Sequence, residues 1–277
     1  MNRLPLDELP RHSTWATYLL APSSDPPSDP EEYTGTARYD DIYSYLLGCY
    51  REDEADIETF AKDTYSRGRE DPDVISTDET LYLATTTELL EQDNTAVRDV
   101  LRPALDGNET VADLGCGWGA TLGVIAEEYP SVTVVGGECS QYGVELATEL
   151  HSDRDSISVE QFDFYGEWDL LDGDNVVVFT RGTLTTLGDV ESVVDRLAAR
   201  AANSNVISGI HLEQTGPHPD TVLGLLRQQY ASVRNYNTDF LSIVENHQDL
   251  TVTHIEYDVI GPNPLHPLTA VRWRPTQ

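Results

Sequence analysis

Short apolar runs alternate with amphipathic stretches through the second half of the chain. The runs that can form strands span residues 111–114, 132–135, 157–162, 175–179 and 205–211. Stretches with helical periodicity lie between or after them, at residues 121–129, 141–150, 190–202 and 221–230. Strands that alternate with helices are typical of βαβ units, because parallel neighbours need a crossover connection. The pattern therefore predicts an α/β fold with a mostly parallel sheet.

The last two strands follow a different pattern. Residues 250–260 and 268–273 alternate between apolar and polar side chains, and a short segment rich in proline, residues 261–267, joins them. Residues 175–179, in contrast, are almost continuously apolar, as expected of a strand buried on both faces. We therefore expect helices on both faces of the sheet. The antiparallel last strand that we also expect is implied by the family resemblance described below.

Residues 36–105 are dominated by helical periodicity and are expected to form an N-terminal helical cap. The residues that recur there at intervals of three and four are Tyr39, Ile42, Tyr43, Leu46 and Leu47. A second helix is expected over residues 80–90 behind Thr77 as a capping residue, and a third over residues 95–101, stopped by Pro103. Helices that merely cover an edge of the sheet are the alternative interpretation.

Residues 1–35 are rich in proline and acidic side chains, above all over residues 21–30. A segment of this composition has too few apolar groups to offset the entropy lost on ordering. We expect most of it to be a flexible arm.

The first apolar run ends in an acid and three alternating glycines. Asp113, Gly115, Gly117 and Gly119 form the pattern Asp-x-Gly-x-Gly-x-Gly, and a helix is expected directly after it. Glycine tolerates a positive φ and lets a ligand approach the backbone, and the following helix offers free N–H groups and positive potential. Gly115, Gly117 and Ala120 also satisfy the dinucleotide pattern Gly-x-Gly-x-x-Gly/Ala. The loop alone therefore leaves two cofactors open.

Two further acids follow the next two strands. Glu138 lies at the tip of the second strand, where a carboxylate can accept hydrogen bonds from both hydroxyls of a ribose. Such an acid is common to NAD and S-adenosylmethionine folds. Asp163 follows the third strand, and a dehydrogenase has no reason to repeat an acid there. With the glycine loop, this set resembles the motifs of class I S-adenosylmethionine-dependent methyltransferases.

The resemblance covers residues 109–215 by motif. It implies a Rossmann-like seven-stranded sheet, S-adenosyl-L-methionine as cofactor and no metal, with residues 106–277 as the catalytic domain. The acid after the third strand then accepts from the adenine amino group. The residues that the resemblance places around the cofactor are Asp113, Gly115, Cys116, Gly117, Gly119, Glu138, Cys139, Asp163, Phe164 and Thr180. Cys116 and Cys139 can also be interpreted as small packing residues.

The methyl acceptor should lie beyond the carboxyl ends of the fourth and fifth strands. That edge carries three candidate catalytic residues, Arg181, His211 and Glu213, and the residues His218, Tyr236 and His266 are expected within reach. His211 could take the proton of an alcohol, and Arg181 could orient a carboxylate through paired hydrogen bonds. These polar groups predict O-methylation of a sugar, a glycan or a uronic acid.

Two features narrow the substrate further. Residues 180–183 read Thr-Arg-Gly-Thr, whereas amino-methylating DNA enzymes typically carry Asn or Asp, two prolines and an aromatic residue there. Residues 236–237 and 263–264 are similar to segments of sugar O-methyltransferases. Two other function classes remain open: an NAD(P)-dependent oxidoreductase, and a non-catalytic S-adenosylmethionine-binding partner of an active homologue.

The charge of the chain sets its expected surroundings. It carries 49 acidic and 17 basic residues, of which only Lys62 is lysine, for a net charge of −32. Such a composition resembles proteins of halophilic archaea, where molar salt shortens the Debye length to about 3 Å and screens the repulsion. It argues against a nucleic-acid partner, because Lys and Arg must neutralise phosphates. Three cysteines, no basic and apolar leader and no long apolar run predict a cytoplasmic protein without a membrane span.

Overall fold

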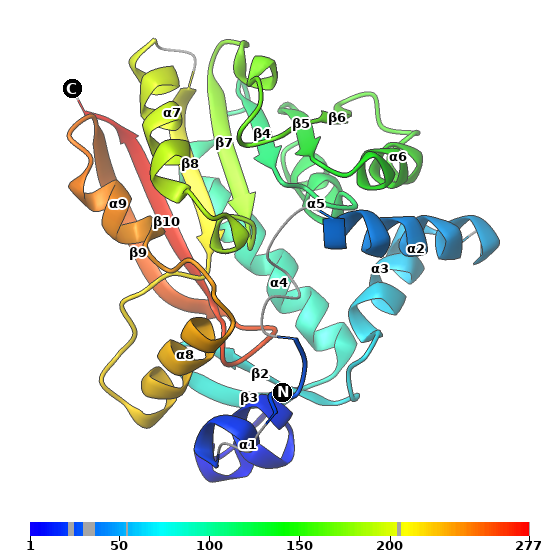
Figure 1. Cartoon of the computed structure of the whole chain (residues 1–277). Coiled ribbons are helices and arrows are strands. Elements are labelled where there is room, and N and C mark those ends of the chain that lie inside the picture. The colour runs from blue at the N-terminus through cyan, green and yellow to red at the C-terminus, as the bar shows by residue number, and fades with distance from the viewer. Residues whose placement is uncertain (22–24, 30–36, 54, 204–205, 277) are drawn as a thin grey trace.

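The protein is described from a computed structural model that covers residues 1–21, 25–29, 37–53, 55–203 and 206–276. Its centre is a seven-stranded sheet whose strands, in order across it, are β6 (Ile157–Gln161), β5 (Thr133–Glu138), β4 (Thr110–Leu114), β7 (Val176–Arg181), β8 (Val206–Glu213), β10 (Leu268–Pro275) and β9 (Leu250–Ile260) (Figure 1). The strands from β6 to β8 pair in parallel, and β10 pairs antiparallel with both β8 and β9. The expected Rossmann-like sheet with an antiparallel last strand is confirmed.

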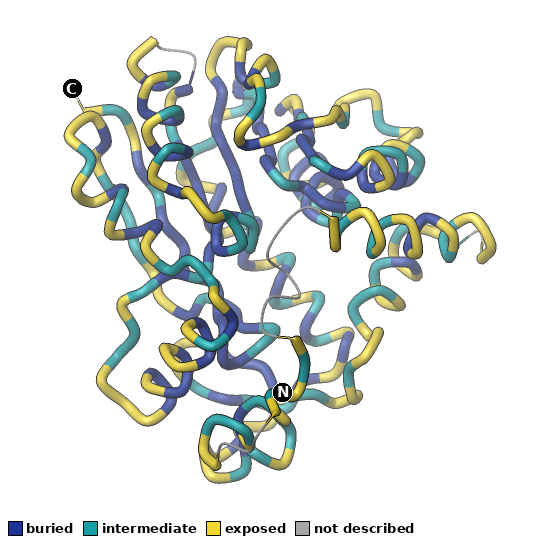
Figure 2. The backbone as a smooth tube through the Cα atoms, viewed as in Figure 1, coloured by how far each residue is buried: buried dark blue, intermediate teal, exposed yellow. Residues whose placement is uncertain are grey.

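Helices cover both faces of the sheet, as the packing of β7 illustrates. Val176 and Val178 belong to the apolar cluster formed with α7 (Val190–Ala202) and α9 (Phe240–Asn246). Val177 and Phe179 belong to the cluster formed with α4 (Thr86–Leu101) and α5 (Ala120–Glu128). Successive side chains of a strand point to opposite faces, so an apolar run of this length is buried on both. The central strands are accordingly the dark, buried part of Figure 2.

The segment before the first strand of the sheet differs from the prediction in part. The helices α2 (Ala37–Asp53) and α3 (Ile57–Ser66) are present, and the expected helix from residue 95 is the end of α4. Residues 80–90, however, begin as a strand: β2 (Asp73–Thr77) and β3 (Thr80–Ala84) form a hairpin, and α4 starts only after the capping residue Thr85. The predicted helix over residues 80–90 is therefore wrong in its first half.

The hairpin escaped the sequence pattern because its two-residue turn consists of Asp78 and Glu79. Both adopt positive φ, 48° and 56°, a conformation that hairpin turns usually obtain from asparagine and glycine. The turn is held by a distant residue instead: Asp258 in β9 accepts from the Glu79 N–H through Oδ2 at 2.8 Å and from the Asp78 N–H through its carbonyl. Because residue 258 is far from the turn in the sequence, the residues around the turn do not reveal this contact.

Residues 1–21 are folded rather than flexible. The strand β1 (Asn2–Arg3) pairs with β3 in a three-stranded sheet, followed by the 3₁₀ segment η1 (Leu6–Arg11) and by α1 (Thr14–Leu20). Leu9 and Ala16 are fully buried and share an apolar cluster with α8 (Val222–Val233). These few apolar side chains are enough to order the segment, contrary to the prediction from its composition. Residues 22–24 and 30–35 of the predicted arm lie outside the described residues.

The connections at the carboxyl ends of the parallel strands all face one edge of the sheet. In Figure 1, α2 and α3 flank this edge on one side, and α8 with α1 lies below it. The helix α6 (Gln141–Leu150), which follows β5, packs against α2. No helix among the described residues is long and apolar enough to cross a membrane.

Candidate active site

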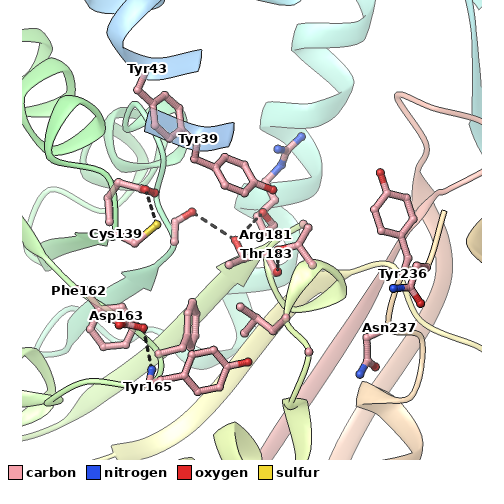
Figure 3. A pocket seen from close by; sticks show the side chains of 18 residues that line it. Tyr39, Tyr43, Cys139, Phe162, Asp163, Tyr165, Arg181, Thr183, Tyr236 and Asn237 are labelled. Atoms are coloured by element: carbon pink, nitrogen blue, oxygen red, sulfur yellow. Dashed lines mark hydrogen bonds between the residues drawn. The ribbon is translucent and has the colours of Figure 1, made fainter. Parts of the chain in front are cut away.

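A cavity of about 570 Å³ opens at the carboxyl edge of the sheet (Figure 3). Its walls come from α2, from the loops after β4, β5, β6 and β7, and from the segment after α8; they consist of Tyr39, Tyr43, Gly115, Glu138, Cys139, Phe162, Asp163, Phe164, Tyr165, Arg181, Gly182, Thr183, Thr186, Leu187, Gly188, Asn235, Tyr236 and Asn237. This volume lies within the range of pockets for small ligands and cofactors.

The glycine loop after β4 borders the cavity at Gly115, whereas Gly117 lines a smaller adjoining cavity. Gly115 has a φ of +80°, and a Cβ there would lie 2.6 Å from Thr183 Oγ1. Gly117 has a φ of +59°, and a Cβ there would lie 2.6 Å from the Tyr43 hydroxyl. Gly119 is left-handed as well and is the N-cap of α5. Any other residue at 115 or 117 would combine backbone strain with a steric clash.

Asp113 and Cys116 lie behind this loop, at a small adjoining cavity of about 320 Å³ that shares Tyr43, Gly115 and Arg181 with the first. The Asp113 side chain is 1% exposed and accepts a hydrogen bond from the Thr121 hydroxyl. Burial raises the pKa of Asp113 to about 7, although the Thr121 hydrogen bond opposes this effect. Cys116 is buried in the apolar cluster of α4 and α5, in agreement with a packing role.

Glu138 at the tip of β5 borders the first cavity and is anchored by the backbone. One carboxylate oxygen accepts from the Gly117 N–H at 3.0 Å and the other from the Ser140 N–H at 2.9 Å. The Cys139 thiol donates to the same carboxylate at 3.3 Å. Burial raises the pKa of Glu138, while these donors lower it and favour the ionised form. The carboxylate is thus held rigidly beside the glycine loop.

Asp163 and Phe164, after β6, also reach this cavity. Asp163 is exposed, and its Oδ1 accepts from the Tyr165 N–H at 2.9 Å, which fixes the side chain in a tight turn. The Phe164 ring packs against Phe162 at a centroid distance of 5.0 Å, and the Phe164 carbonyl accepts from Arg196 Nη1 at 2.8 Å. These contacts of Asp163 and Phe164 hold the loop after β6 in place.

The structure contradicts the prediction that His211 is a catalytic base. His211 is fully buried and lines none of the described cavities. Its Nε2 accepts from the Trp273 indole N–H at 2.9 Å, and its Nδ1 lies 2.9 Å from Thr180 Oγ1. Because an indole can only donate, the ring is neutral with its proton on Nδ1. Burial lowers the pKa of His211 to about 3, so the imidazole is engaged and weakly basic.

Thr180 and Glu213 also belong to this buried network and not to the cavity wall. Thr180 is fully buried, so its predicted contact with a cofactor is wrong. Glu213 is fully buried too, and its two oxygens accept from the Thr183 N–H at 3.1 Å and the Leu184 N–H at 3.0 Å. Burial raises the pKa of Glu213 to about 7. Glu213 therefore holds the loop after β7 and does not contact a ligand, contrary to its predicted catalytic role.

Arg181 reaches both cavities but is already paired. Its Nη2 donates to Asp93 of α4 and, at 3.3 Å, to the Tyr65 hydroxyl of α3. The Tyr65 hydroxyl in turn donates to the other Asp93 oxygen at 2.6 Å. This triad neutralises the guanidinium and ties β7 to the helices before the sheet. The Arg181 Nε is buried without a hydrogen-bond partner.

Several residues of the cavity were not predicted from the sequence as site residues. Tyr39 and Tyr43 stand four residues apart on α2 and were interpreted as one apolar helix face, yet both line the cavity, with ring centroids 6.2 Å apart. Their spacing was visible and a cap was expected here, but the pattern did not single out this helix face as the one that lies over the glycine loop. Asn235 and Asn237 follow α8, and the Asn237 N–H donates to the Thr185 carbonyl at 2.8 Å.

The three residues that were expected within reach of the acceptor, His218, Tyr236 and His266, lie in different places. Tyr236 lines the cavity, with its ring stacked on the imidazole of His266 at a centroid distance of 4.5 Å. His266 itself is buried behind Tyr236, with Nε2 3.3 Å from Thr185 Oγ1. His218 lies at a different cavity beside α8. Of the three, only Tyr236 could touch a ligand in the first cavity.

No protein-family model and no curated protein sequence matches the chain. Solved methyltransferase structures do share its fold. Geranyl diphosphate C-methyltransferase from Streptomyces coelicolor A3(2), in complex with Mg²⁺, geranyl diphosphate and S-adenosyl-L-homocysteine, is similar with a TM-score of 0.50 and 10% identity over 69% of this chain and 82% of that one. Magnesium protoporphyrin IX methyltransferase from Synechocystis PCC 6803 gives a TM-score of 0.50 and 12% identity over 69% and 87%.

A third solved structure, mitomycin 7-O-methyltransferase, matches a larger part of the chain. Its TM-score is 0.50 at 16% identity, and the match covers 94% of this chain and 75% of that one. At such low identity these matches establish the fold and nothing finer. The chain has the Rossmann-like fold of the S-adenosylmethionine-dependent methyltransferases.

Proposed function

We propose that the protein is an S-adenosyl-L-methionine-dependent methyltransferase. The observation that carries the proposal is the convergence of Gly115, Glu138 and Asp163 on one cavity at the carboxyl edge of the sheet. Ligands bind at this edge in open α/β sheets. The antiparallel insertion of β10 between β8 and β9 supports a methyltransferase over an oxidoreductase, because dinucleotide-binding folds normally lack that pair.

The chemistry of the cavity fits the cofactor part by part. Glu138, held by two backbone N–H groups, can accept from the ribose hydroxyls, and the exposed carboxylate of Asp163 can accept from the adenine amino group. Gly115 lines the cavity, so the remainder of the cofactor can lie against its backbone. Glu138 and Asp163 also make the cavity favourable for a cation, and S-adenosylmethionine supplies an electrophilic methyl group on a positively charged sulfur.

We also propose that α2 closes the cavity over the cofactor, as part of the cap formed by residues 36–105. Tyr43 lies against Gly117, and Asp40 accepts from the Ser140 hydroxyl at 2.6 Å, next to Glu138. Burial raises the pKa of Tyr39 to about 12, so its hydroxyl stays protonated beside the cavity. A cover of this kind excludes water and holds the acceptor in line with the methyl group.

The acceptor is proposed to be a sugar, a glycan or a uronic acid, methylated on oxygen. The lining of the cavity also offers hydroxyl and amide groups from Thr186, Asn235, Tyr236 and Asn237. Among the described residues that line the cavity none is a histidine. A carboxylate oxygen needs no base, whereas an alcohol does, so the lining favours the carboxylate of a uronic acid. Arg181 lines the cavity and is the cationic side chain that can orient it.

Methyl transfer from isotope-labelled S-adenosylmethionine tests this proposal. We expect label on glucuronate or galacturonate, or on oligosaccharides that contain them, and we expect mild alkali to release it, because a methyl ester hydrolyses and a methyl ether does not. Label that survives alkali would move the acceptor to a hydroxyl group. Label on none of the sugars, with binding of the cofactor intact, would overturn the acceptor proposal.

A further inference from the structure

A cavity of about 600 Å³, called the second cavity below, lies beside α8 and has no role in the site described so far. The loop of residues 216–220 forms one wall, and residues 236–242 form another. Gly224, Gln228 and Ser232 supply the third wall from α8. Their spacing of four residues places them on one face of the helix, so the cavity runs along α8 toward the residues that follow it.

This cavity meets the first one at Tyr236, which lines both. The segment that separates them is firmly held. The Asn237 N–H donates to the Thr185 carbonyl at 2.8 Å on the side of the first cavity. The Thr238 carbonyl accepts from the Thr215 hydroxyl at 2.8 Å and from the Gly216 N–H at 3.0 Å on the other side. The two cavities therefore lie on either side of one ordered segment, and a ligand that extends from one to the other would contact Tyr236.

The wall of the second cavity is chemically different from that of the first. Gln228 offers both an amide donor and an acceptor, and Asp220 and Asp239 offer carboxylate acceptors. His218 is partly buried, which lowers its pKa to about 4, so its neutral ring offers one donor and one acceptor. Hydroxyl groups, which donate and accept, satisfy such a wall. Anionic groups do not, because both charged side chains are acidic.

We propose that the second cavity binds a neutral, hydroxylated ring of a glycan, next to the unit that is methylated in the first cavity. The inference rests on the proposed function for the identity of that neighbouring unit. It makes the acceptor an oligosaccharide of at least two residues. Selection for this length then depends on the face of α8 that carries Gln228, and not on the residues around Glu138.

The test measures sugar binding directly. Saturation-transfer NMR in multimolar KCl would compare maltose, cellobiose and lactose with glucose, galactose and glucuronate, for the wild type, Gln228→Trp and Gln229→Trp. Both glutamines are exposed neighbours on α8, but only Gln228 lines the cavity. We expect at least one disaccharide to bind, its signal to fall at least fivefold in Gln228→Trp, and the Gln229→Trp control to stay within twofold of the wild type.

Two results would overturn the inference: no disaccharide binds the wild type, or Gln228→Trp leaves the disaccharide signal unchanged. Calorimetric titration of the same three proteins with S-adenosylmethionine separates this failure from failure of the proposed function. Cofactor binding with an unchanged disaccharide signal would remove the second cavity as a sugar site and leave the methyltransferase. Loss of the disaccharide signal in Gln228→Trp without cofactor binding in any protein would keep the sugar site and remove the methyltransferase.

Discussion

His211 stands at the carboxyl end of a parallel strand, where general bases are often found, yet its hydrogen bonds all point inward. Trp273 donates to its Nε2, its Nδ1 pairs with Thr180, and Thr180 is hydrogen-bonded to Glu213. Glu213 then holds the loop after β7 through the Thr183 and Leu184 N–H groups. This relay connects the core of the sheet to the wall of the cavity. A residue placed at the functional edge can thus act on the site by supporting it.

His211→Gln should therefore cost stability and little activity. Losing one of its two hydrogen bonds leaves a buried partner unpaired, which costs about 1–3 kcal/mol. We expect the folded variant to keep methyl transfer within about tenfold of the wild type, whereas loss of a general base would cost about 10²- to 10⁴-fold. Steady-state kinetics on protein verified as folded would decide, and a loss beyond 10²-fold would restore His211 as a base.

The same variant has a predicted pH signature. The folded pKa of His211 is depressed to about 3 from an ordinary value of 6.5, so the unfolded state binds a proton first. Stability from the neutral ring is complete above about pH 6.5 and is lost as the pH falls toward 3, by at most about 1.4 kcal/mol per pH unit. The cost of His211→Gln should shrink between pH 7 and pH 5 in denaturant unfolding. A cost that does not depend on pH would contradict a depressed pKa.

Gly115 shows how the backbone itself makes the site. Gly115→Ala would place a Cβ against Thr183 at a φ of +80°, which strains the loop by about 1–2 kcal/mol before any clash. We expect at least a tenfold loss of S-adenosylmethionine affinity by calorimetry. Gly188→Ala is the matched control, because Gly188 lines the same cavity with open space around its Cα. Equal affinities for the two variants would mean that the glycine loop does not contact the cofactor.

At the level of elements, the parts with their own sequence pattern were predictable. The helices α6 and α7 and the strand β9 occupy the residues expected from periodicity, since their apolar spacing and caps are local. The β2–β3 turn and the folded N-terminal residues were missed, because partners far along the chain stabilise them. The helix α9, which packs in the apolar cluster with α7, was missed as well. In the site, the acids and glycines could be predicted from their motif. Tyr39 and Thr183 could not, because their role arises only where α2 and the loop after β7 meet the glycine loop.

The buried ion pair between Arg227 and Asp258 joins the elements that the sequence did not connect. Arg227 of α8 donates to Asp258 Oδ2 at 2.7 Å and to Ser76 of β2 at 3.0 Å, and both charged side chains are almost fully buried. Arg227→Met leaves the carboxylate uncompensated and should cost about 3–5 kcal/mol. Asp258→Asn in the same chain removes that charge, keeps the left-handed residue type and should recover part of the loss. Denaturant unfolding gives the free energy of unfolding of the two single variants and of the double variant. If the loss in the double variant equals the sum of the two single losses, Arg227 and Asp258 are not a coupled pair.

For the whole molecule, the net charge of −32 dominates its response to solvent. At 0.1 M salt the Debye length is about 10 Å, so the acidic surface repels itself, and at 1 M it falls to about 3 Å. We expect the unfolding temperature to rise steeply in KCl up to molar concentrations. Trehalose at matched osmolality is the control, since an uncharged osmolyte favours burial without screening charge. An equal response to both would show that charge repulsion is not the main destabilising force.

The cavity at the carboxyl edge is proposed to bind S-adenosylmethionine, with Glu138 on its ribose. Calorimetric titration with S-adenosylmethionine, S-adenosylhomocysteine and NAD in multimolar KCl tests it most directly. The control pair is Glu138→Gln and Glu160→Gln, because Glu160 is an exposed acid on the neighbouring strand that does not line the cavity. Hydrogen bonds to a charged group contribute about 1.5–3 kcal/mol.

We predict binding of the first two ligands with dissociation constants on the order of micromolar. We expect it to be weakened at least tenfold in Glu138→Gln and unchanged in Glu160→Gln. Binding of NAD in preference to S-adenosylmethionine, or equal affinities for the wild type and Glu138→Gln, would rule out this cofactor or this role of Glu138.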